Sequence, residues 1–169
     1  MYEIIENTLE KMSGNLEVKN RDGEHLLTRL TYIGKNSEKN TGMYLARTFE
    51  TSRRNNEKND ITSALVINDN YFIKSVEGSR PAINELLSRV INERPHLLLQ
   101  VIDFDEIEVR SWDSFLIKYL TISAQDEDYA LKSFSAGSDF NPYLMKKAQI
   151  TSFLEAIFEE KESQVDSDV

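Results

Sequence analysis

The chain has 169 residues, of which 40% are hydrophobic, so we expect one domain with appended segments and no room for a second full domain. It contains no cysteine, which excludes disulfides, thiolate metal sites and cysteine nucleophiles. A formal charge of -9 disfavours non-specific binding to nucleic acid or anionic membranes, and because no signal peptide or apolar span is recognisable we expect a cytoplasmic protein.

Residues 1–25 are expected to form an extension outside the main domain. Ile5, Leu9 and Met12 share one helical stripe, and Gly14 then interrupts the pattern. This pattern predicts a short docking helix. It either covers an apolar patch of its own chain or contacts another chain.

The central part predicts the order strand, helix, strand, strand, helix, strand, strand. Alternating and helical spacing of apolar residues, together with the turn residues between them, places these elements at residues 26–35, 41–56, 61–67, 71–76, 79–93, 97–104 and 114–123. This order is typical of an α+β, ferredoxin-like sheet with both helices on one face. We therefore expect the ligand slot in the groove between the two helices. Two further helices are expected at residues 126–134 and 141–160.

The stripe along the first central helix changes from apolar to polar. Leu45, Phe49, Ser52 and Asn56 lie on it. A helix that buries only hydrocarbon would not place an amide in line with its core face, whereas a helix over a flat ring with polar rim atoms would. The alternative is that Asn56 only caps the helix C-terminus.

Four short segments occur in a characteristic order: Tyr32 in LTYIG, Asn56 at the end of SRRNN, the ITS of residues 61–63, and FIKSVEG at residues 72–78. In this order they resemble the BLUF family of flavin-binding blue-light receptors, over roughly residues 27–122. The resemblance implies a five-stranded mixed sheet in a BLUF-like domain at 26–123, with two helices on one face. A helical cap at 124–160 would cover the other face, followed by an acidic tail at 161–169.

The resemblance also implies noncovalently bound FAD, with FMN as the alternative. The positions matched to cofactor-binding residues are Tyr32, Thr48, Asn55, Asn56, Lys74, Arg89, Val90 and His96. The two asparagines would bond the pyrimidine edge, because an amide both donates and accepts. Thr48 and Val90 would lie against the ring faces, and Arg89 and His96 near a pyrimidine carbonyl or the phosphates. Taken alone, an arginine such as Arg89 is more often a solvated helix charge and a histidine such as His96 more often a strand lead-in, and no metal site is expected.

Three positions depart from the family pattern. Lys74 stands where the family has the glutamine that relays between the photoactive tyrosine, here Tyr32, and the flavin. Phe115 and Ile117 replace the tryptophan and methionine of the signalling strand. An ammonium cannot accept a hydrogen bond, so Lys74 would instead act as a cation that favours reduced flavin, or reach solvent if the slot is closed.

Three functions remain open at this point. The first is a BLUF-like photoreceptor module with an altered photocycle, which signals through protein contacts of strand five and the C-terminal helices. The others are a flavin redox protein and a flavin-free interaction module. No enzyme motif is recognisable, so we expect no enzyme activity. The expected partners are an unidentified protein and further copies of the chain in a homodimer or larger homo-oligomer, with no nucleic acid and no membrane.

Overall fold

The computed structural model describes residues 22–35, 47, 49–120 and 140–165. Several expected features therefore lie wholly or mainly outside the described residues. They are the helix in the N-terminal extension, the first part of the helix at 41–56, the end of strand five, the helix at 126–134 and the last four residues of the tail.

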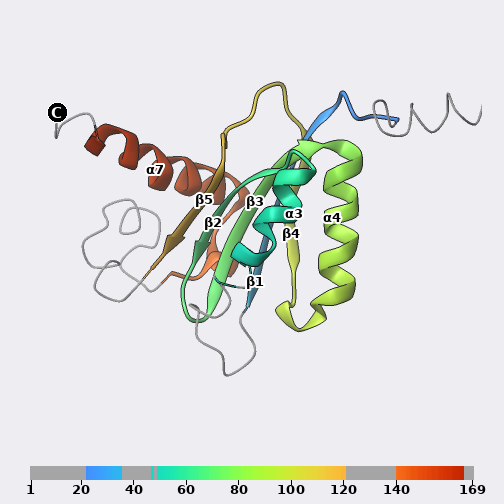
Figure 1. Cartoon of the computed structure of the whole chain (residues 1–169). Coiled ribbons are helices and arrows are strands. Elements are labelled where there is room, and N and C mark those ends of the chain that lie inside the picture. The colour runs from blue at the N-terminus through green and yellow to red at the C-terminus, as the bar shows by residue number, and fades with distance from the viewer. Residues whose placement is uncertain (1–21, 36–46, 48, 121–139, 166–169) are drawn as a thin grey trace, which may run out of the picture.

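Five strands form one mixed sheet, as the sequence predicted (Figure 1). The strands are β1 (Leu27–Lys35), β2 (Thr62–Ile67), β3 (Tyr71–Ser79), β4 (Gln100–Glu106) and β5 (Phe115–Tyr119). Their order is β4-β1-β3-β2-β5, with β2 and β5 parallel and the other neighbours antiparallel. β1 and β3 therefore lie in the middle, where both of their faces are covered.

Helices lie on both faces of the sheet, which confirms the predicted ferredoxin-like α+β fold. The short helix α3 (Arg53–Lys58) and the longer α4 (Arg80–Glu93) lie over one face, and α7 (Lys147–Val165) lies over the other (Figure 1). No helix in these described ranges is both long and apolar enough to cross a membrane.

Local signals fix the hairpin and the start of α4. The side-chain oxygen of Asn68 accepts hydrogen bonds from the backbone N–H groups of Asn70 at 2.9 Å and Tyr71 at 2.7 Å, which closes the predicted turn. The hydroxyl of Ser79 accepts a bond from the backbone N–H of Ala82, and Pro81 lies in the first turn of α4. The hairpin and the second helix were therefore correctly predicted.

Several predicted boundaries were wrong. The third strand continues to Ser79 and not only to residue 76, and the helix predicted at 41–56 is interrupted by a turn at Ser52, after which α3 continues to Lys58. The fourth strand begins at Gln100 and not at residue 97, because a 3-10 turn at Pro95–Leu97 is followed by Leu98 in the left-handed region, with φ 49°. The last helix begins at Lys147 and not at residue 141. There the Asn141 side chain accepts a bond from the N–H of Tyr143 and caps a separate 3-10 turn, Pro142–Leu144.

The end of α7 also differs from the expected domain boundaries. The helix continues to Val165 and so includes the first residues of the expected acidic tail. Residues 161–165, KESQV, contain no glycine or proline to end a helix, and most of them are good helix formers.

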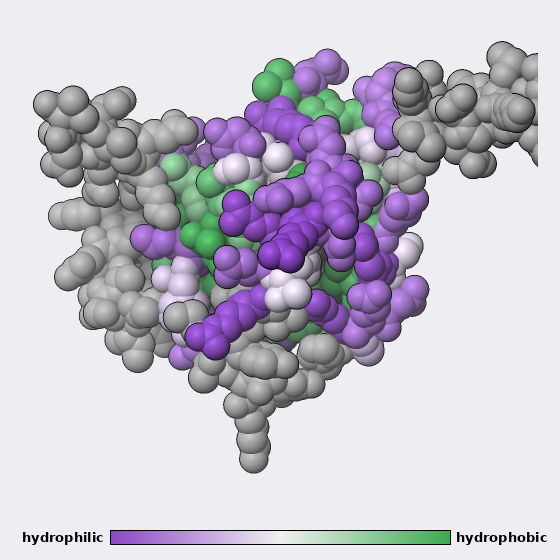
Figure 2. All heavy atoms as spheres, viewed as in Figure 1, coloured by the Kyte–Doolittle hydropathy of each residue, from purple (hydrophilic) through white to green (hydrophobic). Residues whose placement is uncertain are grey.

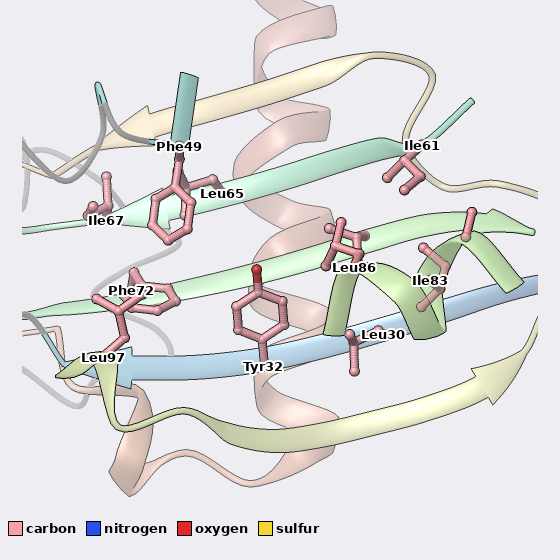
Figure 3. Packing of buried hydrophobic residues seen from close by; sticks show 12 residues of the cluster. Leu30, Tyr32, Phe49, Ile61, Leu65, Ile67, Phe72, Ile83, Leu86 and Leu97 are labelled. Atoms are coloured by element: carbon pink, nitrogen blue, oxygen red, sulfur yellow. The ribbon is translucent and has the colours of Figure 1, made fainter. Parts of the chain in front are cut away.

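Each face of the sheet carries its own hydrophobic core. The core under α3 and α4, drawn in Figure 3, contains Leu30, Tyr32, Phe49, Ile61, Leu65, Ile67, Phe72, Val76, Ala82, Ile83, Leu86 and Leu97. The core under α7 contains Ile33, Ala64, Val66, Ile73, Trp112, Leu120, Phe140, Ile150, Phe153, Leu154, Ile157 and Phe158. Successive residues of β1 and β3 thus enter opposite cores.

The loop between β4 and β5 is fixed to the end of β3 by a buried carboxylate. Glu77 is fully buried and accepts bonds from Arg29, with Nη2 at 2.6 Å, and from the backbone N–H groups of Ser111 at 2.8 Å and Trp112 at 3.1 Å. The indole N–H of Trp112 donates to the hydroxyl of Ser75 at 3.1 Å. β3 therefore positions this loop through the face opposite to α3 and α4.

The outer surface agrees with the acidic, polar composition. On the face seen in Figure 2, hydrophilic residues cover most of the described surface. Phe49, Leu65 and Leu86 contribute to the core beneath this face (Figure 3).

Candidate functional site

A cavity of about 170 Å³ lies between α3, α4 and the sheet, in the groove that the sequence predicted for a ligand. Its described lining residues are Phe49, Thr51, Ser52, Asn55, Asn56, Lys74, Leu86, Arg89, Val90, Glu93 and Arg94. Helical residues form its walls, and Lys74 of β3 reaches it from the sheet. The polar residues Asn55 and Asn56 of α3 thus lie close to the C-terminal end of α4 over the middle strands of the sheet.

Tyr32 and Lys74 are direct neighbours across β1 and β3. Tyr32 is completely buried, and its hydroxyl has no hydrogen-bond partner among the described residues. In Figure 3 its ring extends from β1 toward β3. Burial raises the pKa of Tyr32 above its ordinary value, although the positive charge of Arg94 opposes this shift. The side chain is therefore a neutral phenol with an unused donor.

Lys74 is buried despite its amine, with 3% of its surface exposed. Its Nζ lies 4.4 Å from the centroid of the Phe49 ring, a favourable cation–π distance. Burial, and secondarily the charge of Arg94, lower the pKa of Lys74 to about 7. The amine is thus divided between its charged and neutral forms near neutral pH, and only the neutral form has a lone pair that can accept a hydrogen bond.

Asn56 presents a buried amide, while Asn55 is exposed. The Nδ2 of Asn56 has no hydrogen-bond partner among the described residues, and the side chain is 4% exposed. α3 continues to Lys58, and Asn59 is its C-cap. The alternative that Asn56 merely caps the helix is therefore wrong. The polar end of the stripe does face the cavity, as the sequence predicted.

The remaining predicted positions divide into three groups. Arg89 and Val90 line the cavity from α4. Thr48 and the side chain of His96 lie outside the described residues. Phe115 and Ile117 are not among the described lining residues. Ile117 pairs with Leu65 next to Lys74, and the Phe115 ring is 5.7 Å from the Arg53 guanidinium carbon.

Arg94 was not identified as a site residue from the sequence. Nη1 of Arg94 is buried without a hydrogen-bond partner among the described residues, and its guanidinium carbon is 5.9 Å from the Phe49 centroid. A signal was available: Leu86, Val90 and Arg94 are spaced four residues apart, so this stripe also changes from apolar to polar toward the helix end. The same argument had identified Asn56.

The cavity concentrates positive charge in an acidic protein. Lys74, Arg89 and Arg94 line it with one carboxylate, Glu93, whereas the chain as a whole carries -9. Such a concave, positively charged site favours anionic or electron-rich ligands. Within the described ranges, no group of three or more histidine, aspartate or glutamate side chains could hold a metal ion.

These residues fit the polar edge of a flavin. The unused donors of Tyr32 and Asn56 are buried polar groups that require acceptors, and the carbonyls and ring nitrogens of an isoalloxazine supply them. Phe49 and Val90 supply apolar walls. The cavity is smaller than the roughly 300 Å³ at which ligand pockets usually begin, so as described it matches one end of the ring and not a whole dinucleotide.

Comparisons with known proteins agree with this arrangement. The family model of BLUF, described as sensors of blue-light using FAD, matches residues 27–118. No curated protein matches the chain.

Solved structures with a similar fold include BlsA, the BLUF protein BlrB and BlrP1. BlsA in its photo-activated state is 23% identical, with a TM-score of 0.62, over 77% of this chain and 93% of that one. BlrB in its dark state is 19% identical, with a TM-score of 0.60, over 79% and 98%. Klebsiella pneumoniae BlrP1 with FMN and cyclic diGMP is 20% identical, with a TM-score of 0.56, over 77% of this chain but 36% of that one. At these identities the likeness shows the fold alone.

Proposed function

The chain belongs to the BLUF family of flavin-binding blue-light sensors, and from this premise we propose that it binds FAD in the cavity between α3 and α4 and responds to light through Tyr32 and Lys74. FMN is the alternative cofactor, since the similar BlrP1 structure was solved with FMN. The single observation that carries the proposal is the buried pair: a tyrosine with an unused hydroxyl lies directly across from the lysine that reaches the cavity.

Asn55 and Asn56 would hold the polar edge of the flavin, with Arg89 and Arg94 near its carbonyls or phosphates. Val90, and by resemblance Thr48 and His96, would complete the binding site. When bound, the flavin supplies blue-light absorption and an acceptor for an electron and a proton. The amide of Asn56 is suited to orienting the ring, because it is buried and its Nδ2 has no described protein partner to lose.

Lys74 would change how Tyr32 is coupled to the flavin. A protonated amine has three donors and no acceptor, so it cannot receive the hydrogen bond of the Tyr32 hydroxyl. A neutral amine can receive it, and the pKa of about 7 makes both forms accessible. Neither form has the two alternative orientations of an amide. We therefore infer an altered photocycle, with bleaching or little response in place of a stable rearrangement.

The proposed output is a change in protein contacts. Ile117 packs against the core that contains Tyr32, and Phe115 lies on the same face of β5, so this strand could transmit a change at the cavity. The proposed partners are an unidentified protein and further copies of the chain in a homo-oligomer. We propose a cytoplasmic protein that is not itself an enzyme and that engages neither nucleic acid nor membrane.

The test is the absorption spectrum of the purified, flavin-saturated chain in the dark and under blue light. We expect wild type to bleach or to change little, and Lys74→Gln to gain a reversible red shift, because glutamine restores a side chain that donates, accepts and reorients. Lys58→Gln is the matched control, since it makes the same exchange at an exposed position of α3. An unaltered light response in Lys74→Gln would contradict the proposed role of Lys74.

A second candidate function is a flavin redox protein. It is favoured by the positive charges of Lys74 and Arg94 around one cavity, because buried cations stabilise added negative charge. In that case Lys74→Gln would lower the reduction potential of the bound flavin, while neither protein would give a reversible red shift.

A further inference from the structure

Lys74 differs from the other described lysines in its position relative to the cavity. It is buried between the strands and the helices, yet it is one of the residues that line the open space. Lys35, Lys58, Lys146 and Lys147 are exposed. A small molecule that enters the cavity therefore meets this amine among Phe49 and Leu86 and not in bulk water.

The surroundings favour a neutral, nucleophilic amine. Burial and the charge of Arg94 lower the pKa of Lys74 to about 7. The described charged and titratable groups around Lys74 are Tyr32, its neighbour on β1, Arg89 and Glu93 of α4, and Arg94, the residue that follows α4. At pH 7 the neutral fraction is roughly three orders of magnitude larger than for an ordinary lysine. Desolvation beside a second cation is an established way to activate a lysine toward carbonyl compounds.

The same cavity has a place for a negative charge. The buried Nη1 of Arg94 has no hydrogen-bond partner among the described residues, and Arg89 adds a second guanidinium to the lining. Guanidinium groups bind carboxylates strongly and with defined geometry. With about 170 Å³, the cavity suits a molecule of a few heavy atoms.

We propose that Lys74 is a carbonyl-binding site, which forms a reversible imine with small 2-oxo acids whose carboxylate is held by Arg94 and Arg89. The neutral Nζ adds to the carbonyl carbon to give a carbinolamine. Loss of the carbonyl oxygen as water then leaves the C=N bond. No oxidant or reductant is consumed, and hydrolysis reverses the reaction. This site goes beyond the flavin function and does not depend on it.

The test uses glyoxylate as the probe on the full-length, flavin-free chain. Sodium cyanoborohydride reduces any imine to a stable carboxymethyl group, and peptide mass spectrometry identifies the modified lysine. At pH 7 we expect Lys74 to be labelled at least about tenfold faster than the exposed lysines, because far more of it is neutral. The labelling rate should reach half its maximum near pH 7, where exposed lysines still react slowly.

Variants and a second probe separate recognition from simple reactivity. Lys74→Arg keeps a cation but should abolish labelling at this position. Propionaldehyde, which has no carboxylate, should label wild type less than glyoxylate does, and Arg94→Gln should remove this preference. Labelling of Lys74 no faster than that of Lys58 or Lys147 in wild type would overturn the proposal, and this readout does not depend on whether a variant folds.

Flavin provides an independent comparison. If FAD fills the same cavity, saturation with FAD should protect Lys74 from glyoxylate while the exposed lysines continue to react. Selective labelling that FAD does not block would support the carbonyl site and count against the proposed flavin position. The converse result is that Lys74 of the flavin-free protein reacts no faster than the exposed lysines, but FAD still protects it. That result would support the proposed flavin position and count against the carbonyl site. The two proposals can therefore fail separately.

Discussion

Lys74 places a titratable amine in a buried position. The free energy of unfolding of the flavin-free protein should therefore depend on pH. The pKa of about 7 lies below the ordinary value of 10.5, so between these values the unfolded chain binds more protons than the folded chain. Stability therefore rises with pH through this window, whereas below it Lys74 is protonated in both states, its buried charge destabilises the fold fully, and it adds no further pH dependence. The gain between pH 7 and 9 is about 2 kcal/mol.

Lys74→Met isolates this effect, because methionine has a similar shape and does not titrate. Urea denaturation of the flavin-free proteins should show that wild type gains stability from pH 7 to pH 9 relative to the variant. The variant should also be the more stable protein at pH 7, since it buries no charge. An equal change with pH in both proteins would show that Lys74 titrates normally.

At the residue scale, the sequence identified most of the described cavity but not its electrostatics. Asn56 was placed by helical spacing and Lys74 and Val90 by the resemblance, and all three line the cavity. Tyr32, also placed by the resemblance, lies next to Lys74 across β1 and β3. The proximity of Arg94 to Lys74 depends on where the chain leaves α4, which spacing along the sequence does not specify. The shift in the pKa of Lys74 therefore could not be predicted in size before the structure placed Arg94.

At the element scale, β3 serves both faces of the sheet. Lys74 faces the cavity, while Ser75 and Glu77 hold the β4–β5 loop on the other side through Trp112 and neighbouring backbone groups. Trp112 in turn contacts Phe158 of α7, with ring centroids 5.9 Å apart. Neighbouring residues of one strand are thus connected to the proposed cofactor site directly and to the far helix through Trp112.

The buried carboxylate of Glu77 should be essential for this arrangement. Glu77→Ala leaves Arg29 and the N–H groups of Ser111 and Trp112 without their partner, so we expect a loss of about 3–5 kcal/mol in the free energy of unfolding. Glu57→Ala is the control, because it removes an exposed pair with Arg53 at 2.9 Å and should change stability by less than about 1 kcal/mol. Similar small losses in both variants, measured in urea, would contradict a structural role for Glu77.

Sequence patterns predicted the elements better than their ends. Alternation and helical spacing located all five strands, but Leu97, which ends the first 3-10 turn, was assigned to the fourth strand, and the whole turn Pro142–Leu144 was assigned to the last helix. The side chain of Asn141 accepts a hydrogen bond from the N–H of Tyr143 and so caps the second turn. Leu98 adopts a positive φ, which the presence of a leucine does not predict. Both depend on local geometry and not on hydrophobic spacing.

At the scale of the whole molecule, the sheet lies between two cores, and the far core depends on α7. Phe153 is fully buried and belongs to this core, where its ring stacks on Phe140 at a centroid distance of 5.7 Å. Phe153→Ala should lower the free energy of unfolding by about 3–5 kcal/mol. Leu144→Ala, at a residue that is 77% exposed, should change it by less than about 0.5 kcal/mol. Equal effects in thermal or urea denaturation would contradict the packing of α7 on the sheet.

The overall fold was predictable because order, spacing and family motifs all indicated the same sheet. The function depends on a smaller feature: a cavity lined by the amide of Asn56 and the amine of Lys74, with the buried phenol of Tyr32 directly across the sheet from Lys74. The groove and Asn56 followed from the order of elements and helical spacing, whereas the roles of Tyr32 and Lys74 could be inferred only through the family resemblance.

Binding of FAD by the purified chain tests this account most directly. After saturation with FAD and removal of free flavin, the protein should retain about one flavin per chain and absorb blue light. Asn56→Leu should retain less, because it removes the buried amide from the cavity wall. A colourless wild-type protein that takes up neither FAD nor FMN would contradict the central claim that this cavity is a flavin site.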